Sequence, residues 1–315
     1  MKYLFRLFRF PNLVIVAILQ CLIYFNLLMP LLDQYGIQPS FPPMEFGLFV
    51  LVTLLITGGG YIINDLVDYD ADVINNEGKV IVKKKIPLGI ASWIYYGTIT
   101  SGFFLALFLA FFSHNLDLLW IFPVAVSGLF IYSIVLKRQV LIGNIVVALF
   151  AGGVAGIVAI AGKAGLADLN EVAPEKTAQF FIVVWAYVGF AFFSTLFREI
   201  VKDIEDVEGD RKAGFKTLPI VAGVSLSKKI GLSIGILLFL MTGLGVFKIL
   251  PWVMENIPDY WPWMILVAVI SLVLEVISIG MLWKAKDKKA YWNISQVIKL
   301  IMIMGIVFLS FIRLN

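Results

Sequence analysis

Long apolar stretches separated by short polar segments run through the whole chain. A transmembrane helix needs about 20 mainly apolar residues to cross roughly 30 Å of hydrocarbon, and nine stretches meet this length. The predicted spans cover approximately 11–31, 45–64, 91–112, 117–136, 140–162, 178–198, 228–249, 259–283 and 291–313. The pattern predicts an all-α polytopic membrane protein, a bundle of about nine transmembrane helices that forms one domain over residues 1–315.

The composition agrees with a membrane location. Of the 315 residues, 61% are hydrophobic and 15% are charged, and the mean hydropathy is +0.95. Soluble domains carry roughly 25% charged and 45–50% apolar residues. The one cysteine, Cys21, lies in the first predicted span, which excludes a disulfide framework. The sequence contains no zinc-ligand spacing, phosphate-binding glycine loop or nucleophile elbow.

Lysine and arginine positions predict the orientation. When the N-terminus is placed in the cytoplasm, most basic residues fall in cytoplasmic connections, as they do in most multi-span membrane proteins. Two of these connections, 65–90 and 199–227, are long and contain both acidic and basic residues. The remaining cytoplasmic connections are short. We therefore expect the N-terminus to be cytoplasmic and the chemistry to lie in these two cytoplasmic connections.

Both long connections carry aspartates with the spacing i, i+3, i+7. The two sets are Asp65, Asp68 and Asp72, and Asp203, Asp206 and Asp210. On a helix at about 100° per residue, these positions share an arc of about 60°. Glu199 falls within the arc of the second set, whereas Asp70 and Glu208 point away from their arcs. Each set therefore predicts one working face of carboxylates.

Carboxylates on one helix face repel one another, so such a face is favoured when a cation offsets the charge. Mg²⁺ takes oxygen ligands and is commonly held by one or two carboxylates together with substrate phosphates and waters. Nearby lysines and arginines suit phosphate oxygens. The alternative, two solvated acidic connections, does not explain a spacing that occurs twice, each time directly after an apolar span. The pattern predicts that the six aspartates bind Mg²⁺ and a diphosphate.

At these residues the sequence resembles the UbiA superfamily of intramembrane prenyltransferases, over nearly the whole chain. Asn64 with the first aspartates matches the family motif N-D-x-x-D-x-x-x-D, and the second set matches the second family motif. Residues 9–12 (RFPN) are similar to the start of the family's first helix, and residues 132–144 to its link between helices four and five. Where the family commonly has Arg-Pro-Leu-Pro-Ser-Gly, residues 84–89 read KKIPLG, so an ammonium replaces a bidentate guanidinium.

The resemblance implies Mg²⁺-dependent transfer of a prenyl group from its diphosphate, in a central cavity capped by cytoplasmic loops. Residues 198–220 are most similar to digeranylgeranylglyceryl phosphate synthases, which implies a geranylgeranyl donor and the hydroxyl of geranylgeranylglyceryl phosphate as acceptor. An aromatic prenyltransferase of quinone biosynthesis, with a 4-hydroxybenzoate-like acceptor, and a haem farnesyltransferase are the enzyme alternatives. A cation-coupled transporter is the non-enzyme alternative, but transporter sites lie near the membrane midplane.

The six aspartates are the candidate catalytic residues and metal ligands. The candidate substrate-binding residues are Asn12, Asn64, Lys83, Lys84, Lys137, Asn144, Glu199 and Lys202. The lysines would contact phosphate oxygens. Asn12 and Asn144, in apolar surroundings, would orient a substrate or bond between helices. Expected partners are a prenyl diphosphate, a lipid or aromatic prenyl acceptor and the lipid bilayer; no nucleic acid is expected, and the sequence leaves the oligomeric state open.

Two ionisable residues lie deep inside predicted spans, Glu275 and Lys299. In an antiparallel helix pair they would reach a similar depth, about 14 Å from the surface. Ionisable groups inside a membrane usually pair and face the interior. We therefore expect these two side chains to approach each other or to share a polar cluster.

Overall fold

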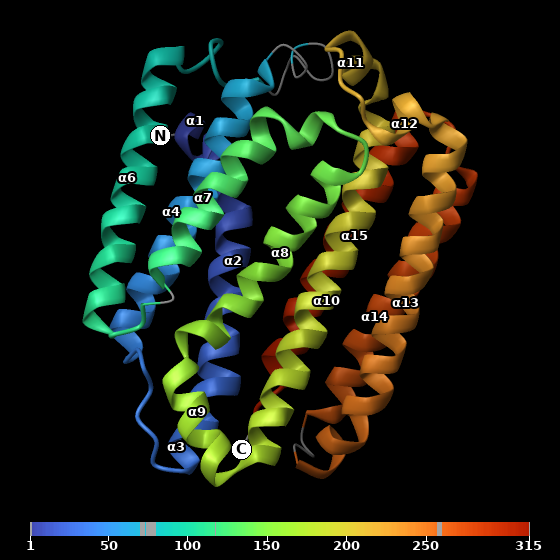
Figure 1. The fold of residues 1–315 in the computed structure, drawn as a ribbon. Helices are drawn as coiled ribbons and strands as arrows, with labels where there is room; N and C mark the ends of the chain where they lie inside the picture. The colour runs from blue at the N-terminus through green and yellow to red at the C-terminus, as the bar shows by residue number, and fades with distance from the viewer. Residues whose placement is uncertain (1, 70–72, 74–79, 117, 257–259, 315) are drawn as a thin grey trace.

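A computed structural model describes residues 2–69, 73, 80–116, 118–256 and 260–314 of the chain (Figure 1). Within these ranges, nine helical segments are long and apolar enough to cross a membrane. They are Phe10–Gln34, Pro43–Val67, Leu88–Phe112, Leu118–Arg138, Ile142–Ala161, Pro174–Glu205, Gly223–Ile249, Trp261–Lys284 and Lys288–Phe311. The predicted all-α, multi-span fold is confirmed, and each predicted span overlaps one of these segments.

Most spans are one continuous helix. These are α4 (Pro43–Val67), α6 (Leu88–Phe112), α7 (Leu118–Ile134), α8 (Ile142–Ala161), α10 (Pro174–Glu205), α13 (Gly223–Asn256), α14 (Trp261–Lys284) and α15 (Lys288–Phe311). The first span is composite: α2 (Phe10–Leu22), the π-helix η1 (Ile23–Leu28) and α3 (Met29–Gln34). The short helices are α1 (Lys2–Leu7), η3 (Leu136–Arg138), α9 (Lys163–Val172), α11 (Val207–Lys212) and α12 (Leu218–Val221).

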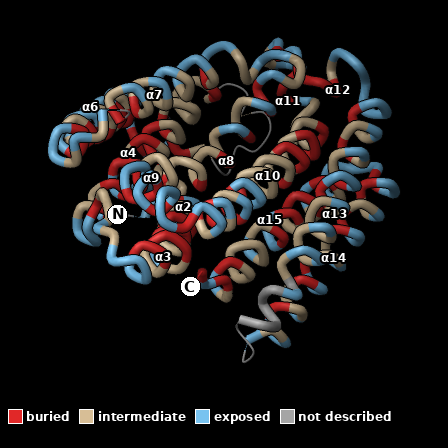
Figure 2. The backbone as a smooth tube through the Cα atoms, turned by 60° about the horizontal axis from the view of Figure 1, so that its bottom comes forward, coloured by how far each residue is buried: buried red, intermediate tan, exposed pale blue. Residues whose placement is uncertain are grey.

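The spans form two groups joined by α2 and α8. Helices α4, α6 and α7 contact one another on one side, and α10, α13, α14 and α15 contact one another on the other (Figure 1). Helix α8 packs along α10 and also contacts α2 and α7. In Figure 2 the exposed residues lie along the outward faces of these helices, as expected for surfaces that meet lipid. We call the end of the bundle that carries α11 and α12 the acidic end.

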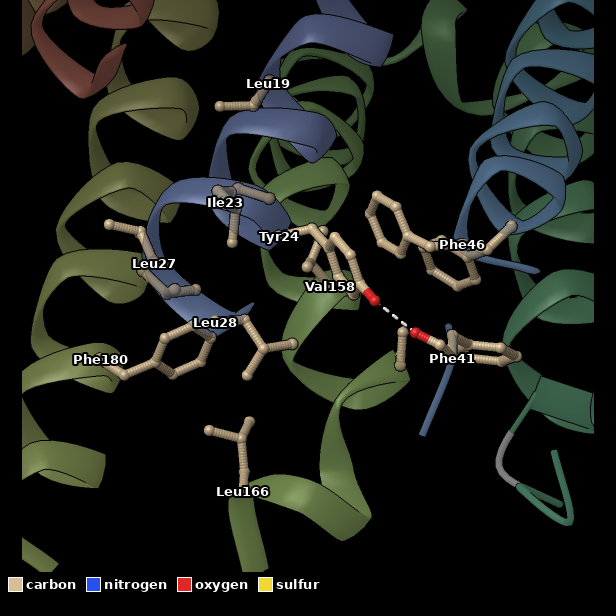
Figure 3. Packing of buried hydrophobic residues seen from close by; sticks show 14 of the residues in the cluster. Leu19, Ile23, Tyr24, Leu27, Leu28, Phe41, Phe46, Val158, Leu166 and Phe180 are labelled. Carbon is tan, nitrogen blue, oxygen red and sulfur yellow. Dashed lines mark hydrogen bonds between the residues drawn. The ribbon is translucent and has the colours of Figure 1, made fainter. Parts of the chain in front are cut away.

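The largest apolar core surrounds the π-helix of the first span (Figure 3). Tyr24 stacks on Phe46 with ring centroids 3.8 Å apart, and its hydroxyl donates a hydrogen bond to the Phe41 carbonyl. Leu27 and Phe180 are fully buried in the same cluster. This core lies at the end of the bundle opposite the acidic end and anchors the first span to α4 and α10.

Two hydrogen bonds join the first and last spans near the end of the bundle opposite the acidic end. The Asn26 side-chain amide donates to the Ser310 carbonyl at 3.2 Å, and the Leu314 N–H donates to the Asn26 carbonyl at 3.2 Å. Leu314 is itself buried. Helix α15 thereby completes the packing of η1.

The predicted association of Glu275 with Lys299 is wrong. Glu275 is buried, and its Oε1 accepts hydrogen bonds from Thr242 at 3.0 Å and from Ser271 at 3.5 Å. Lys299 is exposed and donates to Gln296 at 3.3 Å. Depth alone was the basis of the prediction, but the rotation of α14 turns Glu275 towards α13.

Candidate functional site

The first aspartate set begins at the end of α4. Asn64 and Asp65 lie in its last turn, and Asp68 follows the helix with φ −89° and ψ 4°. The Asp68 N–H still donates to the Asn64 carbonyl at 2.9 Å, so the chain leaves the helix directly after this residue. The predicted ligand Asp72, and Asp70 beside it, lie outside the described residues.

The second set spans a break between two helices. Asp203 lies in α10, Asp210 lies in α11, and Asp206 connects them with φ −98° and ψ 6°. The Asp206 N–H donates to the Lys202 carbonyl at 2.9 Å. The set is therefore not on one continuous helix, as the spacing argument assumed, because the near-zero ψ of Asp206 redirects the chain.

The same helix break occurs at the equivalent aspartate of both sets. The N–H groups of Asp68 and Asp206 each donate the last helical hydrogen bond, and the two residues have nearly identical backbone angles. The duplicated spacing in the sequence thus corresponds to a duplicated backbone geometry. In the second set, Asp210 is buried whereas Glu208 is exposed, and the division into a working face and an outer face stays a prediction.

Lys137 lies against the first set. It belongs to η3, the short turn that links α7 to α8. Its ammonium donates to Asp68, with which it forms a salt bridge, and to the Asn64 side-chain oxygen at 3.2 Å. Asp68 is only 2% exposed, so this ammonium is a major source of charge compensation for its carboxylate.

Charged groups at the first aspartate set influence the pKa of Asp210 in the second set. Burial and the neighbouring Asp206 raise the pKa of Asp210 to about 6. Lys137 and Lys202 oppose this rise in the pKa, and Asp68 adds to it. Asp68 belongs to the first set and Lys137 is its ion-pair partner, yet the charges of both act on Asp210 of the second set. The two sets therefore form one electrostatic site at the acidic end.

Polar partners hold the remaining carboxylates of the second set. Asn144 in α8 donates to Asp203 at 3.0 Å, and Lys202 lies 3.6 Å from Asp206. Arg198 donates to Glu199 at 2.7 Å. Asn144 therefore bonds between helices, which is one of the two roles that the sequence left open, and its part in orienting a substrate stays a prediction.

Two residues near the site were not among the predicted site residues. Arg9 donates to Asp65 at 2.8 Å, and its guanidinium lies 4.9 Å from the ring centroid of Tyr61. Tyr132 lies within electrostatic range of Lys137, Glu199, Asp68 and Asp203. Both belong to segments that carried the family resemblance, but only the folded chain shows which carboxylates they approach.

Three predicted substrate-binding residues, Asn12, Lys83 and Lys84, are exposed. Asn12 makes a long 3.5 Å hydrogen bond to the Tyr61 hydroxyl at an exposed position. Lys83 and Lys84 are exposed in a tight turn closed by a bridge between Val82 and Ile86. The Lys83 ammonium lies 4.1 Å from the ring centroid of Tyr69. The roles of these three residues stay predictions.

The site chemistry suits Mg²⁺ bound together with a phosphate ligand. Among the described residues, no three His, Cys, Asp or Glu side chains form a ready metal cage. Mg²⁺ does not require one, since it is commonly held by one or two carboxylates, substrate phosphates and waters. The second oxygen of Asp68 is buried without a hydrogen-bond partner. This carboxylate oxygen of Asp68 is therefore available to bind a cation that enters the site together with the substrate.

Gly143 determines how closely α8 approaches the turn that carries Lys137. A Cβ at this position would lie 2.7 Å from the Lys137 Cα and 2.8 Å from the Leu136 carbonyl oxygen. Because both neighbours are backbone atoms, Gly143→Ala should shift the turn. We expect lower thermal stability, by about 1–3 kcal/mol for overpacking, and lower activity.

A matched control is available in the same helix. A Cβ on Gly153 would meet no atom within 4 Å, so Gly153→Ala should retain the melting temperature and activity of the unmodified protein. Thermal unfolding of the purified variants together with a prenyl transfer assay measures both effects. Equal behaviour of the two variants would show that the contact of Gly143 with the turn is unimportant.

Comparisons with known proteins agree with this geometry. The model of the UbiA prenyltransferase family matches residues 34–302, and the chain belongs to this family. It is therefore a membrane-bound prenyltransferase, and the resemblance inferred from the sequence is confirmed.

Individual members of the family and solved structures are similar to this chain. The chain is 33% identical to the digeranylgeranylglyceryl phosphate synthase of Thermococcus sibiricus over 220 residues, which cover 66% of this chain and 71% of that protein. A solved structure of a digeranylgeranylglyceryl phosphate synthase has a TM-score of 0.62 at 24% identity and covers 99% of this chain and 96% of its own. A UbiA homolog from Archaeoglobus fulgidus bound to DMAPP and Mg²⁺ has a TM-score of 0.53 at 17% identity, covering 98% and 99%. The two solved structures show a shared fold.

Proposed function

We propose that this protein transfers a geranylgeranyl group from its diphosphate to the hydroxyl of geranylgeranylglyceryl phosphate, in a Mg²⁺-dependent reaction of ether-lipid synthesis. The observation that carries the proposal is the pair of aspartate sets together with Lys137, which is ion-paired with Asp68 and whose charge also acts on Asp210. The names of the relatives support the choice of acceptor, since digeranylgeranylglyceryl phosphate synthases are among the proteins most similar to this chain.

The aspartates would hold Mg²⁺, which would neutralise charge on the diphosphate of the donor. Asp65, Asp68 and Asp72 would contribute from one side, and Asp203, Asp206 and Asp210 from the other. Lys137 and Lys202 already lie beside these carboxylates and would donate to the phosphate oxygens. Charge-assisted hydrogen bonds of this kind stabilise negative charge as it develops on the leaving group.

The reaction exchanges one carbon–oxygen bond for another. The allylic C1–O bond of the donor breaks, and its electron pair leaves with the diphosphate. The acceptor hydroxyl attacks C1 and forms an ether, and its proton passes to an oxygen of the released diphosphate. The prenyl chains would lie among the apolar side chains of the bundle, where exclusion of water protects the electron-poor carbon.

The chain is a multi-pass integral membrane protein, and we infer that its acidic end and N-terminus face the cytoplasm. The concentration of basic residues at this end supports that orientation. Both substrates are amphiphiles that reside in the bilayer. Their charged groups would therefore meet the aspartates at the membrane surface, while the predicted capping by cytoplasmic loops stays a prediction.

The assay that tests this proposal compares acceptors and metal. Purified protein in lipid nanodiscs is given geranylgeranyl diphosphate with either geranylgeranylglyceryl phosphate or 4-hydroxybenzoate, and product is measured with Mg²⁺ and with excess EDTA. We expect product only with the glycerol lipid, loss of activity in EDTA, and recovery when Mg²⁺ is restored. Prenylation of 4-hydroxybenzoate in place of the lipid would overturn the proposed acceptor.

A further inference from the structure

A cavity lies within the group formed by α10, α13, α14 and α15 (Figure 1). Its volume is about 100 Å³, and each of the four helices contributes to its wall. On α10 the wall includes Tyr187 and Phe190. Counted along α10, Phe190 is about 20 Å from Asp203 and about 140° away around the helix. The cavity is therefore separate from the proposed diphosphate site.

Three residues with hydroxyl groups interrupt the otherwise apolar wall. They are Tyr187 of α10, Thr242 of α13 and Ser271 of α14. Thr242 and Ser271 donate to Oε1 of Glu275, and Tyr187 donates to the Gly305 carbonyl. A hydroxyl has one proton to donate and two lone pairs. These three oxygens therefore remain able to accept hydrogen bonds from a ligand.

The carboxyl group of Glu275 lies beside two of these hydroxyls. Its side chain is 1% exposed, and its Oε2 is buried without a hydrogen-bond partner among the described residues. A buried polar atom without a partner carries a desolvation cost, and an ionisable group within a membrane span usually marks a functional site. Because Thr242 and Ser271 belong to the cavity wall, their hydrogen bonds connect Glu275 to the cavity.

These groups define the chemistry of a suitable ligand. The oxygens require a hydrogen-bond donor, and the rest of the wall requires an apolar body. An alcohol meets both requirements, and since its hydroxyl can also accept, it matches a carboxyl group with or without its proton. An ammonium would also donate, but a charged group is far more costly to move into hydrocarbon. A cavity of about 150 Å³ takes up benzene, so this smaller one suits about four or five non-hydrogen atoms.

We propose that the cavity binds the hydroxyl end of an alcohol dissolved in the membrane, with the hydroxyl held by Thr242, Ser271 and Glu275. Ala186 of α10 belongs to the wall and is exposed, so a molecule in the bilayer can reach the cavity from the side. The site goes beyond prenyl transfer and does not depend on it. A binding measurement therefore tests the site directly.

The test measures binding of isobutanol to the full-length protein in lipid nanodiscs by saturation-transfer NMR. Isobutyl chloride, in which chlorine replaces the hydroxyl, has the same number of non-hydrogen atoms and no donor. We expect Thr242→Val to weaken isobutanol binding about fivefold or more, the loss of one hydrogen bond, and to leave binding of isobutyl chloride unchanged. Ser271→Ala is a second variant and should shift the isobutanol affinity in the same direction.

A matched pair of glycines on α13 tests whether the alcohol occupies the cavity. Gly245 lines the cavity, and a Cβ there would meet no atom within 4 Å. Gly245→Leu should therefore fill the space and abolish isobutanol binding. Gly243 also has open space around a Cβ but is not part of the wall, so Gly243→Leu should bind as the unmodified protein does. Both changes bring the same gain in helix propensity, and thermal unfolding confirms that each variant is folded.

Three results would overturn the proposal. Equal isobutanol binding by the unmodified protein and Gly245→Leu would show that the alcohol only dissolves in the lipid. An equal loss of isobutanol and isobutyl chloride binding in Thr242→Val would show that the cavity selects shape and not a hydroxyl. Tighter binding of isobutylamine than of isobutanol would identify a cation site. Because none of these measurements uses prenyl transfer, the proposed function is tested separately.

Discussion

Replacing Asp68 or Asp210 by Asn is expected to reduce prenyl transfer by about 100-fold or more. Loss of partners that only orient metal ligands already costs 10–100-fold, and these two carboxylates are proposed to contact the metal directly. Both are buried at the acidic end, one in each set. The substitution keeps the size of the side chain and removes its charge, so the result reports on metal and diphosphate binding.

The matched control for this prediction is Glu208→Gln. Glu208 lies in α11 with Asp210, but its side chain is exposed. We expect its activity to stay within about twofold of the unmodified protein, as for most surface substitutions. Activity is measured over a Mg²⁺ titration, and thermal unfolding confirms that each variant is folded. A comparable loss in Glu208→Gln would contradict the distinction between a working face and an outer face.

Replacing Lys137 by Met is expected to reduce both activity and metal-free stability. The Lys137 ammonium compensates the buried carboxylate of Asp68, and removal of one partner from a buried ion pair costs about 3–5 kcal/mol. It would also remove a donor to the diphosphate, so we expect transfer to fall about 100-fold or more. The measurements are thermal unfolding without metal and the prenyl transfer rate.

A second measurement separates the two roles of Lys137. Added Mg²⁺ should restore stability to Lys137→Met, because a cation beside Asp68 replaces the lost charge, but it should not restore activity. The control is Lys229→Met, the same substitution at an exposed lysine of α13, which should change neither quantity. If Lys137→Met unfolds at the same temperature as the unmodified protein without metal, the charge compensation is not important.

The sequence was sufficient to place the spans because each has its own uninterrupted apolar run. It was less informative about helix ends. Helix α10 continues to Glu205, beyond the predicted end of its span, and so Glu199, Lys202 and Asp203 lie on a helix and not in a loop. Polar residues end an apolar run, but they do not end a helix that continues out of the hydrocarbon.

The acidic sets could be predicted from their spacing, but their partners could not. Lys137 is 69 residues from Asp68 in the sequence, and Asn144 is 59 residues from Asp203. Such contacts depend on how helices pack and rotate. Rotation also explains the incorrect expectation for Glu275, whose depth follows from counting residues but whose partner, Thr242, follows from the face that α14 turns to α13.

The clasp between Asn26 and Ser310 joins residues 284 positions apart in the chain. During synthesis the chain emerges from its N-terminus, so the first span enters the membrane long before α15 exists. Until the last helix is inserted, the polar side chain of Asn26 lacks this partner. The packing of the first span against the last therefore has to be completed after translation of the final span, and a ribosome-bound chain that ends before Ser310 should lack this contact between the first and last spans.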